Sequence, residues 1–285
     1  MYRPLEVGDV ACYWGMTILS RIQTPAGLRW TLDGRSLPSG LSLSFLLGMG
    51  REEMMRVLTA LPTEELDGTA VAPIEPTQEV WASGVTYLRS SVERQAESSV
   101  ADVYARVYEA ARPEIFFKTL GRRVVGPGGK IRIRRDSDWN VPEPELVLVI
   151  NRSGEIVGYT AGDDVSSRSI EGENPLYLPQ AKTYDGSCAM GPGIVLAADD
   201  ELGDVPIHLS VERAGSKIFA GDARTSQMKR SFADLVSYLV RETTFDDGVF
   251  LFTGTGIVPS QDFTLLPGDD VTIAVGDVTL RNAVS

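Results

Sequence analysis

Histidine, cysteine and long hydrophobic runs are all scarce in this sequence. His208 is the only histidine among 285 residues. A single histidine excludes histidine-rich metal sites and gives little support to a catalytic serine–histidine pair. Cys12 and Cys188 lie far apart, and neither belongs to a CxxC pair, so a disulfide framework is excluded. No apolar run approaches the length of a membrane span, and the first residues lack a signal-peptide pattern. We therefore predict a cytoplasmic protein with no membrane partner.

Positive charge is scarce as well. The chain has 27 basic and 39 acidic residues, which gives a formal net charge of −12. A nucleic-acid-binding protein usually carries a basic stripe, and the longest candidate is the alternation of Lys130, Arg132 and Arg134. The solvated face of a strand explains that alternation more simply. We expect no nucleic-acid partner.

The composition and a proline-rich segment suggest that the chain divides into a small and a large part. Hydrophobic residues make up 43% of the sequence, enough for one large core or for a small domain plus a large one. A proline-rich, polar stretch covers residues 62–76. We predict a small N-terminal domain at 1–65, a linker at 66–80 and a main domain at 81–285. The N-terminal part could serve as a lid or as an oligomer contact.

The periodicity of apolar residues predicts few helices and many strands. Residues 50–61 are helical in character, and apolar stripes with helical spacing predict further helices at 93–111 and 229–242. Short alternating or β-branched runs predict strands at 131–135, 145–150, 155–161, 193–197, 207–212 and 271–275. The expected fold class is a mixed, β-rich α+β protein.

Two of these strands form a predicted hairpin that is the most informative segment of the chain. The dipeptide Ser153-Gly154 favours a two-residue loop between them. In that register Glu145 lies opposite Gly162, and Glu143 lies opposite Asp164. Residues that face each other in this way have Cβ atoms about 4.5–5.5 Å apart. Since Glu143 and Glu145 are two residues apart, both project from the same face.

The hairpin therefore groups three carboxylates, Glu143, Glu145 and Asp164, and turns Asp163 to the other face. Like charges so close together repel unless a cation lies between them or they splay into water. An all-oxygen set of ligands suits Mg²⁺, with Mn²⁺ or Ca²⁺ as alternatives. From the spacing alone, an acidic strand end that is exposed to solvent is an alternative to a metal site.

Short motifs in a fixed order then give the sequence a family resemblance. They are Glu143-Pro-Glu145-Leu, Gly162-Asp-Asp164-Val-Ser-Ser-Arg168, Ala181-Lys182-Thr-Tyr-Asp185, Met190-Gly-Pro192, Gly254-Thr255-Gly256, Leu266-Pro-Gly268-Asp269 and Leu280-Arg-Asn282-Ala-Val284. From about residue 81 onwards the chain resembles the fumarylacetoacetate hydrolase family. The resemblance implies a mixed β-sandwich roll, assembly as a homo-oligomer (a dimer or a tetramer) and activity on a small 2-oxo acid.

The resemblance also implies roles for individual residues. The family's three metal carboxylates correspond to Glu143, Glu145 and Asp164, the set that the hairpin register selects. Lys182 matches the active-site lysine, which can stabilise an enolate or move a proton. Thr255 matches the threonine that binds the substrate carboxylate. Without the resemblance, Lys182 would be a surface lysine in a loop and Thr255 part of a flexible turn.

Gly84, in the run Gly84-Val-Thr-Tyr87, matches a glycine whose backbone amide faces the bound acid. A glycine there allows the chain to approach a ligand closely. An ordinary turn is the alternative.

The sequence departs from the hydrolytic members of that family at two places. They carry a histidine about three residues after the tyrosine of this motif and a glutamate three positions further on. Here the two positions hold Ser90 and Glu93, and His208 is better explained as a structural residue. In place of the family's active-site glutamine stands Glu171, which adds an acid to the substrate pocket. Hydrolysis of a carbon–carbon bond is therefore disfavoured.

An acid pair without the histidine suits elimination of water. The runs GVTYLRS, RPEIFFK and SIEGENPLYLPQAKTYDGSCAMGP resemble the branch of the family that dehydrates 2-keto-3-deoxy-D-arabinonate to 2-oxoglutarate semialdehyde in pentose oxidation. Glu114 precedes an apolar run, where a carboxylate can have a raised pKa, and is the candidate base. It could equally be an exposed acid at a helix end.

Two other functions stay open on the sequence alone. One is an acylpyruvate hydrolase, a decarboxylase or a dioate isomerase of the same family. The other, from a different class, is a non-catalytic module that binds a small acid or a metal.

Overall fold

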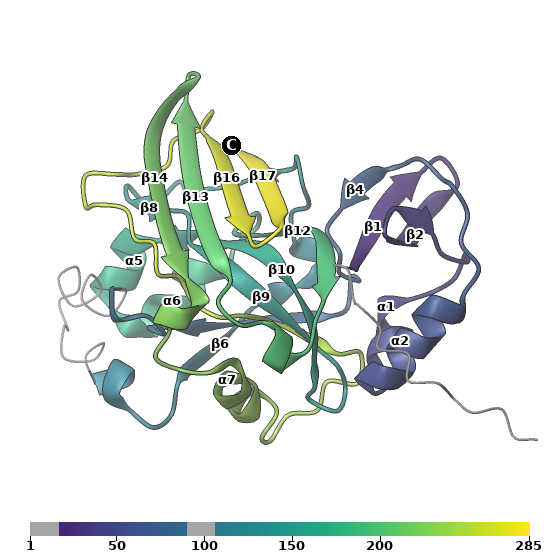
Figure 1. Ribbon diagram of the computed structural model, residues 1–285. Coiled ribbons are helices and arrows are strands. Elements are labelled where there is room, and N and C mark those ends of the chain that lie inside the picture. The colour runs from purple at the N-terminus through teal and green to yellow at the C-terminus, as the bar shows by residue number, and fades with distance from the viewer. Residues whose placement is uncertain (1–16, 90–105) are drawn as a thin grey trace, which may run out of the picture.

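The computed structural model describes residues 17–89 and 106–285. A large mixed sheet of ten strands runs through the protein in the order β3-β2-β1-β12-β10-β9-β15-β5-β6, with β4 paired to β1 (Figure 1). Its strands are β1 (Ile18–Thr24), β2 (Gly27–Leu32), β3 (Arg35–Ser36), β4 (Thr69–Val71), β5 (Glu79–Gly84), β6 (Glu114–Leu120), β9 (Pro144–Ile150), β10 (Ile156–Asp164), β12 (Cys188–Leu196) and β15 (Val249–Phe252). Strands β15 and β5 pair in parallel.

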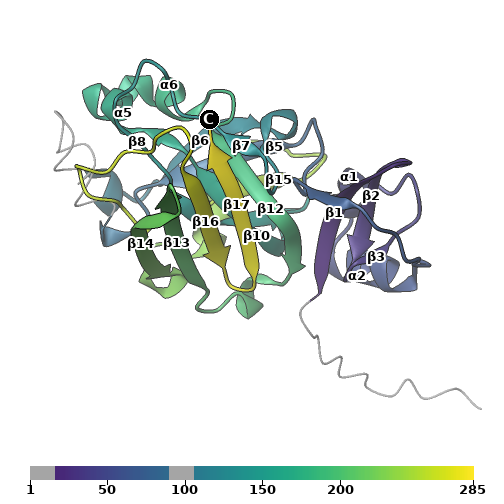
Figure 2. The same cartoon turned by 90° about the horizontal axis from the view of Figure 1, so that it is seen from above.

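A second sheet of five strands packs against the large one, and both views show it lying across strands β9, β10 and β12 (Figures 1 and 2). Its order is β14-β13-β16-β17-β7. These strands are β7 (Lys130–Ile131), β13 (Pro206–Arg213), β14 (Ser216–Arg224), β16 (Asp270–Val275) and β17 (Val278–Val284). Two short strands, β8 (Asn140–Val141) and β11 (Ser166–Ser167), pair with each other beside the site described below.

The helices are short. They are α1 (Leu43–Leu47), α2 (Arg51–Ala60), α5 (Arg168–Glu173), α6 (Leu178–Lys182) and α7 (Phe232–Leu239). Single 3₁₀ turns occur at Gly121–Arg123, Pro175–Tyr177, Asp199–Glu201 and Thr225–Gln227. None of the helices in the described part of the chain is long and apolar enough to cross a membrane.

Strand β9 is buried on both faces and joins the two cores. Leu146, Leu148 and Ile150 pack into the cluster between the two sheets, which also holds the apolar face of α7. Val147 and Val149 point the other way, into the cluster that α1 and α2 cover. A strand covered on both faces carries a continuous apolar run instead of an alternating one. Its polar end, where Glu143 and Glu145 lie, is therefore fixed by packing on two sides.

The N-terminal strands β1–β4, with α1 and α2, lie at one end of the large sheet (Figure 1). Strand β1 pairs directly with β12, where Ile18 lies opposite Val195, so the sheet continues without a break. Strand β4 lies within the proline-rich stretch and pairs with β1. The proposed division of the chain at residues 66–80 stays a prediction.

Most of the predicted elements are present, two differ, and one lies mainly outside the described residues. The strand expected at 131–135 is shorter, because β7 (Lys130–Ile131) pairs with β17 only as far as Ile131. The helix expected at 229–242 begins at Phe232, since the Ser231 hydroxyl caps it by accepting from the Asp234 N–H. Most of the helix expected at 93–111, together with Ser90 and Glu93, lies outside the described residues.

Candidate metal centre and active site

The hairpin of β9 and β10 brings the predicted carboxylates together. Glu145 lies opposite Gly162, and Pro144 lies opposite Asp163. One step further, the Asp164 N–H donates to the Glu143 carbonyl at 3.0 Å. The predicted opposition of these residues is confirmed.

The loop that was expected to set this register is different. Asn151 pairs with Glu155 through a 3.0 Å backbone hydrogen bond, which leaves three loop residues instead of two. The Asn151 side chain closes the loop by accepting from the Ser153 and Glu155 N–H groups at 3.0 and 2.8 Å. A β-bulge between Ile156 and Gly158 then adds one residue to β10. The extra loop residue and the bulge offset each other, so the predicted register holds at the carboxylates although the predicted turn was wrong.

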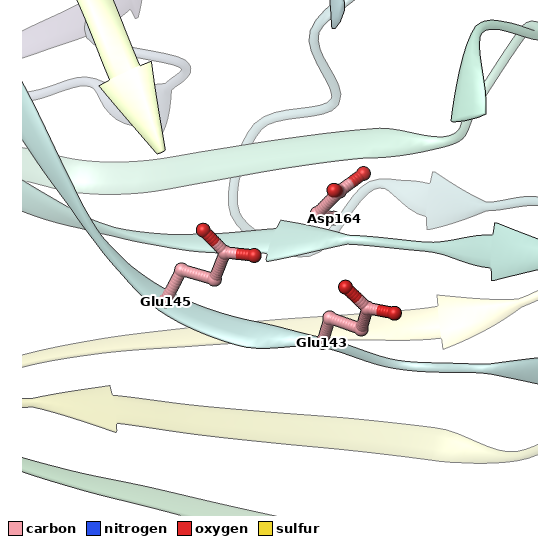
Figure 3. A group of neighbouring side chains, drawn as sticks. All are labelled: Glu143, Glu145 and Asp164. Atoms are coloured by element: carbon pink, nitrogen blue, oxygen red, sulfur yellow. The ribbon is translucent and has the colours of Figure 1, made fainter. Parts of the chain in front are cut away.

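The three carboxylates form a compact, buried cluster. Glu143, Glu145 and Asp164 are 5%, 1% and 1% exposed. One oxygen of each lies within 4.8 Å of the others. Figure 3 shows the two glutamates rising from one strand segment and Asp164 facing them from the neighbouring strand. Asp163 is not in the cluster: its Oδ1 accepts from the Glu143 N–H at 3.0 Å, and burial raises its pKa to about 8.

Three buried cations surround this cluster. The Lys182 ammonium donates to Glu143 Oε2 at 2.8 Å and to Asp164 Oδ2 at 3.0 Å. Lys118, fully buried, forms an ion pair with Asp164 and donates to the Lys182 carbonyl at 2.5 Å. Arg168 Nη1 lies 3.7 Å from Glu143 Oε1. Each carboxylate that faces a cation is thereby held in one orientation.

The carboxylates do not share this compensation equally. Lys118 and Lys182 together outweigh burial and hold the pKa of Asp164 below its ordinary value. Burial, reinforced by the negative charges of Asp164 and Glu143, raises the pKa of Glu145 well above its ordinary value. The Gly254 N–H donates to Glu145 Oε2 at 2.5 Å, and this hydrogen bond lowers the raised pKa of Glu145 only in part. The Glu145 corner of the cluster therefore favours a further positive charge.

The cluster opens into a small cavity. The cavity is lined by all the residues that were predicted from the sequence to form the site: Gly84, Glu114, Glu143, Glu145, Asp164, Glu171, Lys182 and Thr255. His208 is not among them, and it pairs with Asp222 at 2.8 Å on the β13–β14 hairpin. These residues come from β5, β6, the β9–β10 hairpin, α5, α6 and the loop after β15, so the cavity lies where six segments meet.

Glu114 and Gly84 are directly opposite each other on β6 and β5. A Cβ atom built on Gly84 would overlap the Glu114 carboxylate, whose Cδ would lie only 2.8 Å from it. The glycine therefore makes room for the Glu114 side chain. This differs from the role the sequence suggested for Gly84, which was close approach to a ligand.

Thr255 and Glu171 are held on other sides of the cavity. The Thr255 hydroxyl exchanges hydrogen bonds with the backbone of Ile257 at 3.1 and 3.2 Å, which fixes the loop after β15. Glu171, in the first turn of α5, forms a 3.3 Å salt bridge with Arg168. Ser167 caps that helix, because its hydroxyl accepts from the Ile170 N–H.

The sequence offered no physical argument for a role of Lys118, in the pocket or elsewhere, and none for Arg168. Lys118 is the extra residue at a β-bulge in β6, two positions beyond Phe116, which lines the cavity, and four beyond Glu114. The two-residue spacing of Glu114, Phe116 and Lys118 was a usable signal, because alternate residues of a strand share a face. Arg168 offered the weaker signal of a charged residue between Asp164 and Glu171.

Comparisons with known proteins agree with this geometry. The family model described as "Fumarylacetoacetate (FAA) hydrolase C-terminal" matches residues 79–285. A probable 2-keto-3-deoxyxylonate dehydratase of Haloferax volcanii is 49% identical over 77% of this chain and 76% of its own length. The 2-dehydro-3-deoxy-D-arabinonate dehydratase of Saccharolobus solfataricus is 44% identical over 72% of this chain and 70% of its own.

A solved structure extends the similarity over nearly the whole chain. It is a 2-keto-3-deoxy-D-arabinonate dehydratase complexed with magnesium and 2,5-dioxopentanoate, 34% identical, with a TM-score of 0.79 and coverage of 95% of this chain and 99% of that one. The resemblance inferred from the motifs is thereby confirmed. The chain belongs to the fumarylacetoacetate hydrolase family.

Proposed function

We propose that this protein is a Mg²⁺-dependent dehydratase that converts 2-keto-3-deoxy-D-arabinonate into 2,5-dioxopentanoate, which is 2-oxoglutarate semialdehyde. The observation that carries this proposal is the similarity, over 95% of the chain, to a dehydratase whose structure holds magnesium and 2,5-dioxopentanoate. The two dehydratases with 49% and 44% identity support the same reaction.

The buried carboxylates fit a magnesium ion. The cavity is lined by five carboxyl side chains, those of Glu114, Glu143, Glu145, Asp164 and Glu171. The salt bridges described above bring three cations to this group, Lys118, Lys182 and Arg168. One oxygen each of Glu143, Glu145 and Asp164 lies within 4.8 Å of the others, close enough for one divalent cation to contact all three. Oxygen donors alone are the set that Mg²⁺ prefers, and Glu143, Glu145 and Asp164 would hold it, with Mn²⁺ or Ca²⁺ as alternatives.

The first step of the reaction removes a proton from C3 and the hydroxyl from C4 as water and forms a C3–C4 double bond. When bound, the cation would draw electron density from the carboxylate and the 2-keto oxygen and so acidify the C3 protons. Glu114, held in the space that Gly84 leaves, would accept the C3 proton. The Lys182 ammonium would stabilise negative charge on the 2-keto oxygen or donate a proton to the departing hydroxyl.

The substrate carboxylate would bind at the end of the cavity that Gly84 and Glu114 share. Thr255 offers a hydroxyl there, and the Gly84 region offers backbone amides beside Gly254. Phe116 supplies an apolar wall, and its ring lies 5.9 Å from the Lys182 ammonium. An apolar wall beside a charge strengthens every electrostatic contact at the site by excluding water.

A substrate panel tests the function. Purified protein with Mg²⁺ should form 2,5-dioxopentanoate from 2-keto-3-deoxy-D-arabinonate, followed by ¹H NMR, and should stop in EDTA. Acylpyruvates, followed by loss of their ultraviolet absorbance, should be turned over poorly. Cleavage of acylpyruvates with no dehydration of the sugar acid would overturn the proposal in favour of a hydrolase.

We also propose that the enzyme acts in the cytoplasm as a homo-oligomer, a dimer or a tetramer. The sequence features given above support the location, and the family resemblance supports the assembly. Light scattering coupled to size exclusion should report a multiple of the 30.9 kDa chain. A monomeric mass at micromolar concentration would refute the assembly.

A further inference from the structure

The cavity has two chemically different ends. At one end, the Gly254 N–H bonds to Glu145, and a Cβ on Gly254 would lie 3.0 Å from the Ser83 carbonyl, which places Gly84 and Glu114 on this side. At the other end, Arg168 Nη1 lies between Glu143 Oε1, at 3.7 Å, and Glu171 Oε2, at 3.3 Å.

The two ends are separated by roughly the length of the substrate. Glu145 and Glu143 mark them, and two residues along a strand span about 7 Å. A five-carbon acid with its carboxylate beside Thr255 therefore directs its C4 and C5 hydroxyl groups toward Glu171. In that orientation Glu114 faces the C1–C3 half and Glu171 faces C5.

The proposed reaction needs a second proton acceptor at that far end. Loss of water from C3 and C4 gives an unsaturated 2-oxo acid that still carries the C5 hydroxyl. To reach 2,5-dioxopentanoate, C5 must lose a proton while C3 gains one, which moves the double bond to C4–C5. The resulting enol then loses its hydroxyl proton as C4 gains one, and the aldehyde forms. Every hydrogen moves as a proton, so no oxidant is required.

The position of Glu171 suits removal of the C5 proton in this second step. Its side chain is 3% exposed and lines the cavity, and Arg168, 4% exposed, holds its carboxylate through the salt bridge. Arg168 is itself held by its contact with the ring of Trp139, 5.8 Å away, and by its N–H bond to the Trp139 carbonyl. A carboxylate fixed in this way can accept a hydrogen bond from a hydroxyl and a proton from the adjacent carbon.

We propose that Glu171 binds the C5 hydroxyl of the substrate and removes the C5 proton, completing a reaction that Glu114 begins at C3. The inference rests on the proposed function. Arg168 is a positioning residue in this scheme, because it holds the Glu171 carboxylate and does not touch the reacting atoms.

The test compares two substrates in the full-length protein with Mg²⁺. The first is 2-keto-3-deoxy-D-arabinonate, and the second is 2-oxo-4-hydroxypentanoate, which lacks the C5 hydroxyl and can undergo only the elimination. Glu171→Gln keeps the shape of the side chain but cannot take a proton. Glu173→Gln, an exposed position on the same helix, is the matched control.

Glu171→Gln should lower formation of 2,5-dioxopentanoate by about 10²-fold or more, the usual contribution of a positioned acid or base. The unsaturated 5-hydroxy-2-oxo acid should accumulate and be seen by NMR. The rate of elimination from 2-oxo-4-hydroxypentanoate by this variant should stay within about threefold of the wild-type rate. The control variant should match wild type on both substrates.

Equal loss on the two substrates, or full aldehyde formation by Glu171→Gln, would overturn the assignment. Failure of the proposed function itself has a separate signature. In that case the wild-type protein would not dehydrate 2-keto-3-deoxy-D-arabinonate at all, whatever the variant did.

Discussion

The contact between Gly84 and Glu114 makes a mutation of the glycine a test of the proposed base. In Gly84→Ala, the new Cβ would lie 2.8 Å from the Glu114 Cδ, whereas ordinary contacts begin at 3.4 Å. The nearer carboxylate oxygen overlaps it even more, so the carboxylate must move by about 1 Å. A displacement of about 1 Å in a catalytic group can lower the rate about 10²-fold. We expect kcat to fall by about that factor.

The fold should tolerate the substitution. Gly84 ends strand β5 and does not have the positive φ that would favour glycine, so alanine fits the backbone. The melting temperature should therefore change little. Gly50→Ala is the control, because a Cβ there meets no atom closer than 3.7 Å.

A double-mutant cycle separates a displaced base from a blocked substrate. In the Glu114→Ala background there is no carboxylate to displace, so adding Gly84→Ala should change the residual kcat by less than about twofold. Steady-state kinetics of the four proteins give the coupling directly. If the two effects multiply, or if Gly84→Ala alone is fully active, the glycine does not position Glu114 and the reasoning fails.

Three further predictions concern the metal cluster and the residues beside it. Glu143→Ala and Asp164→Ala should each abolish Mg²⁺-dependent turnover and the rise in melting temperature that Mg²⁺ gives the wild type, and a retained rise would contradict the metal assignment. Lys118→Met should raise the Mg²⁺ concentration needed for half-maximal activity about tenfold, an effect within the usual range for groups that orient ligands, whereas unchanged Mg²⁺ dependence would show that Asp164 needs no such support. In EDTA, Asp163→Asn should stabilise the protein more at pH 8 than at pH 5: the folded pKa of about 8 lies above the ordinary 3.8, so the stability Asp163 contributes is lost as pH rises through that window. Equal melting shifts at the two pH values would contradict that sign.

Local patterns predicted strands β9, β10, β12, β13 and β16 but not the other long strands of the two sheets. The run 145–150 is apolar throughout, and the structure shows why: side chains of both parities are buried, in two different clusters. The turn was harder to predict. Asn151 closes a three-residue loop with its own side chain, and nothing in the apolar pattern reports that bond.

The residues of the site also fall into a group that local patterns predict and a group that they do not. Glu143, Glu145 and Asp164 could be grouped from one hairpin, since strand pairing fixes which side chains face each other. Lys118 and Arg168 reach the cluster from separate elements, and their approach depends on a bulge and on the start of a helix. Long-range contacts of this kind are not encoded in local periodicity.

The offsetting turn and bulge of the β9–β10 hairpin have a consequence for redesign of the loop. Shortening the three-residue loop to a two-residue type I′ turn would stiffen the hairpin only if the bulge between Ile156 and Gly158 were deleted in the same variant. Changed alone, either feature would slide β10 by one residue, turn Asp164 away from the glutamates and bring Asp163 or Val165 to their side. The loop and the bulge thus behave as one unit of the metal centre, although the loop lies at the opposite end of the hairpin.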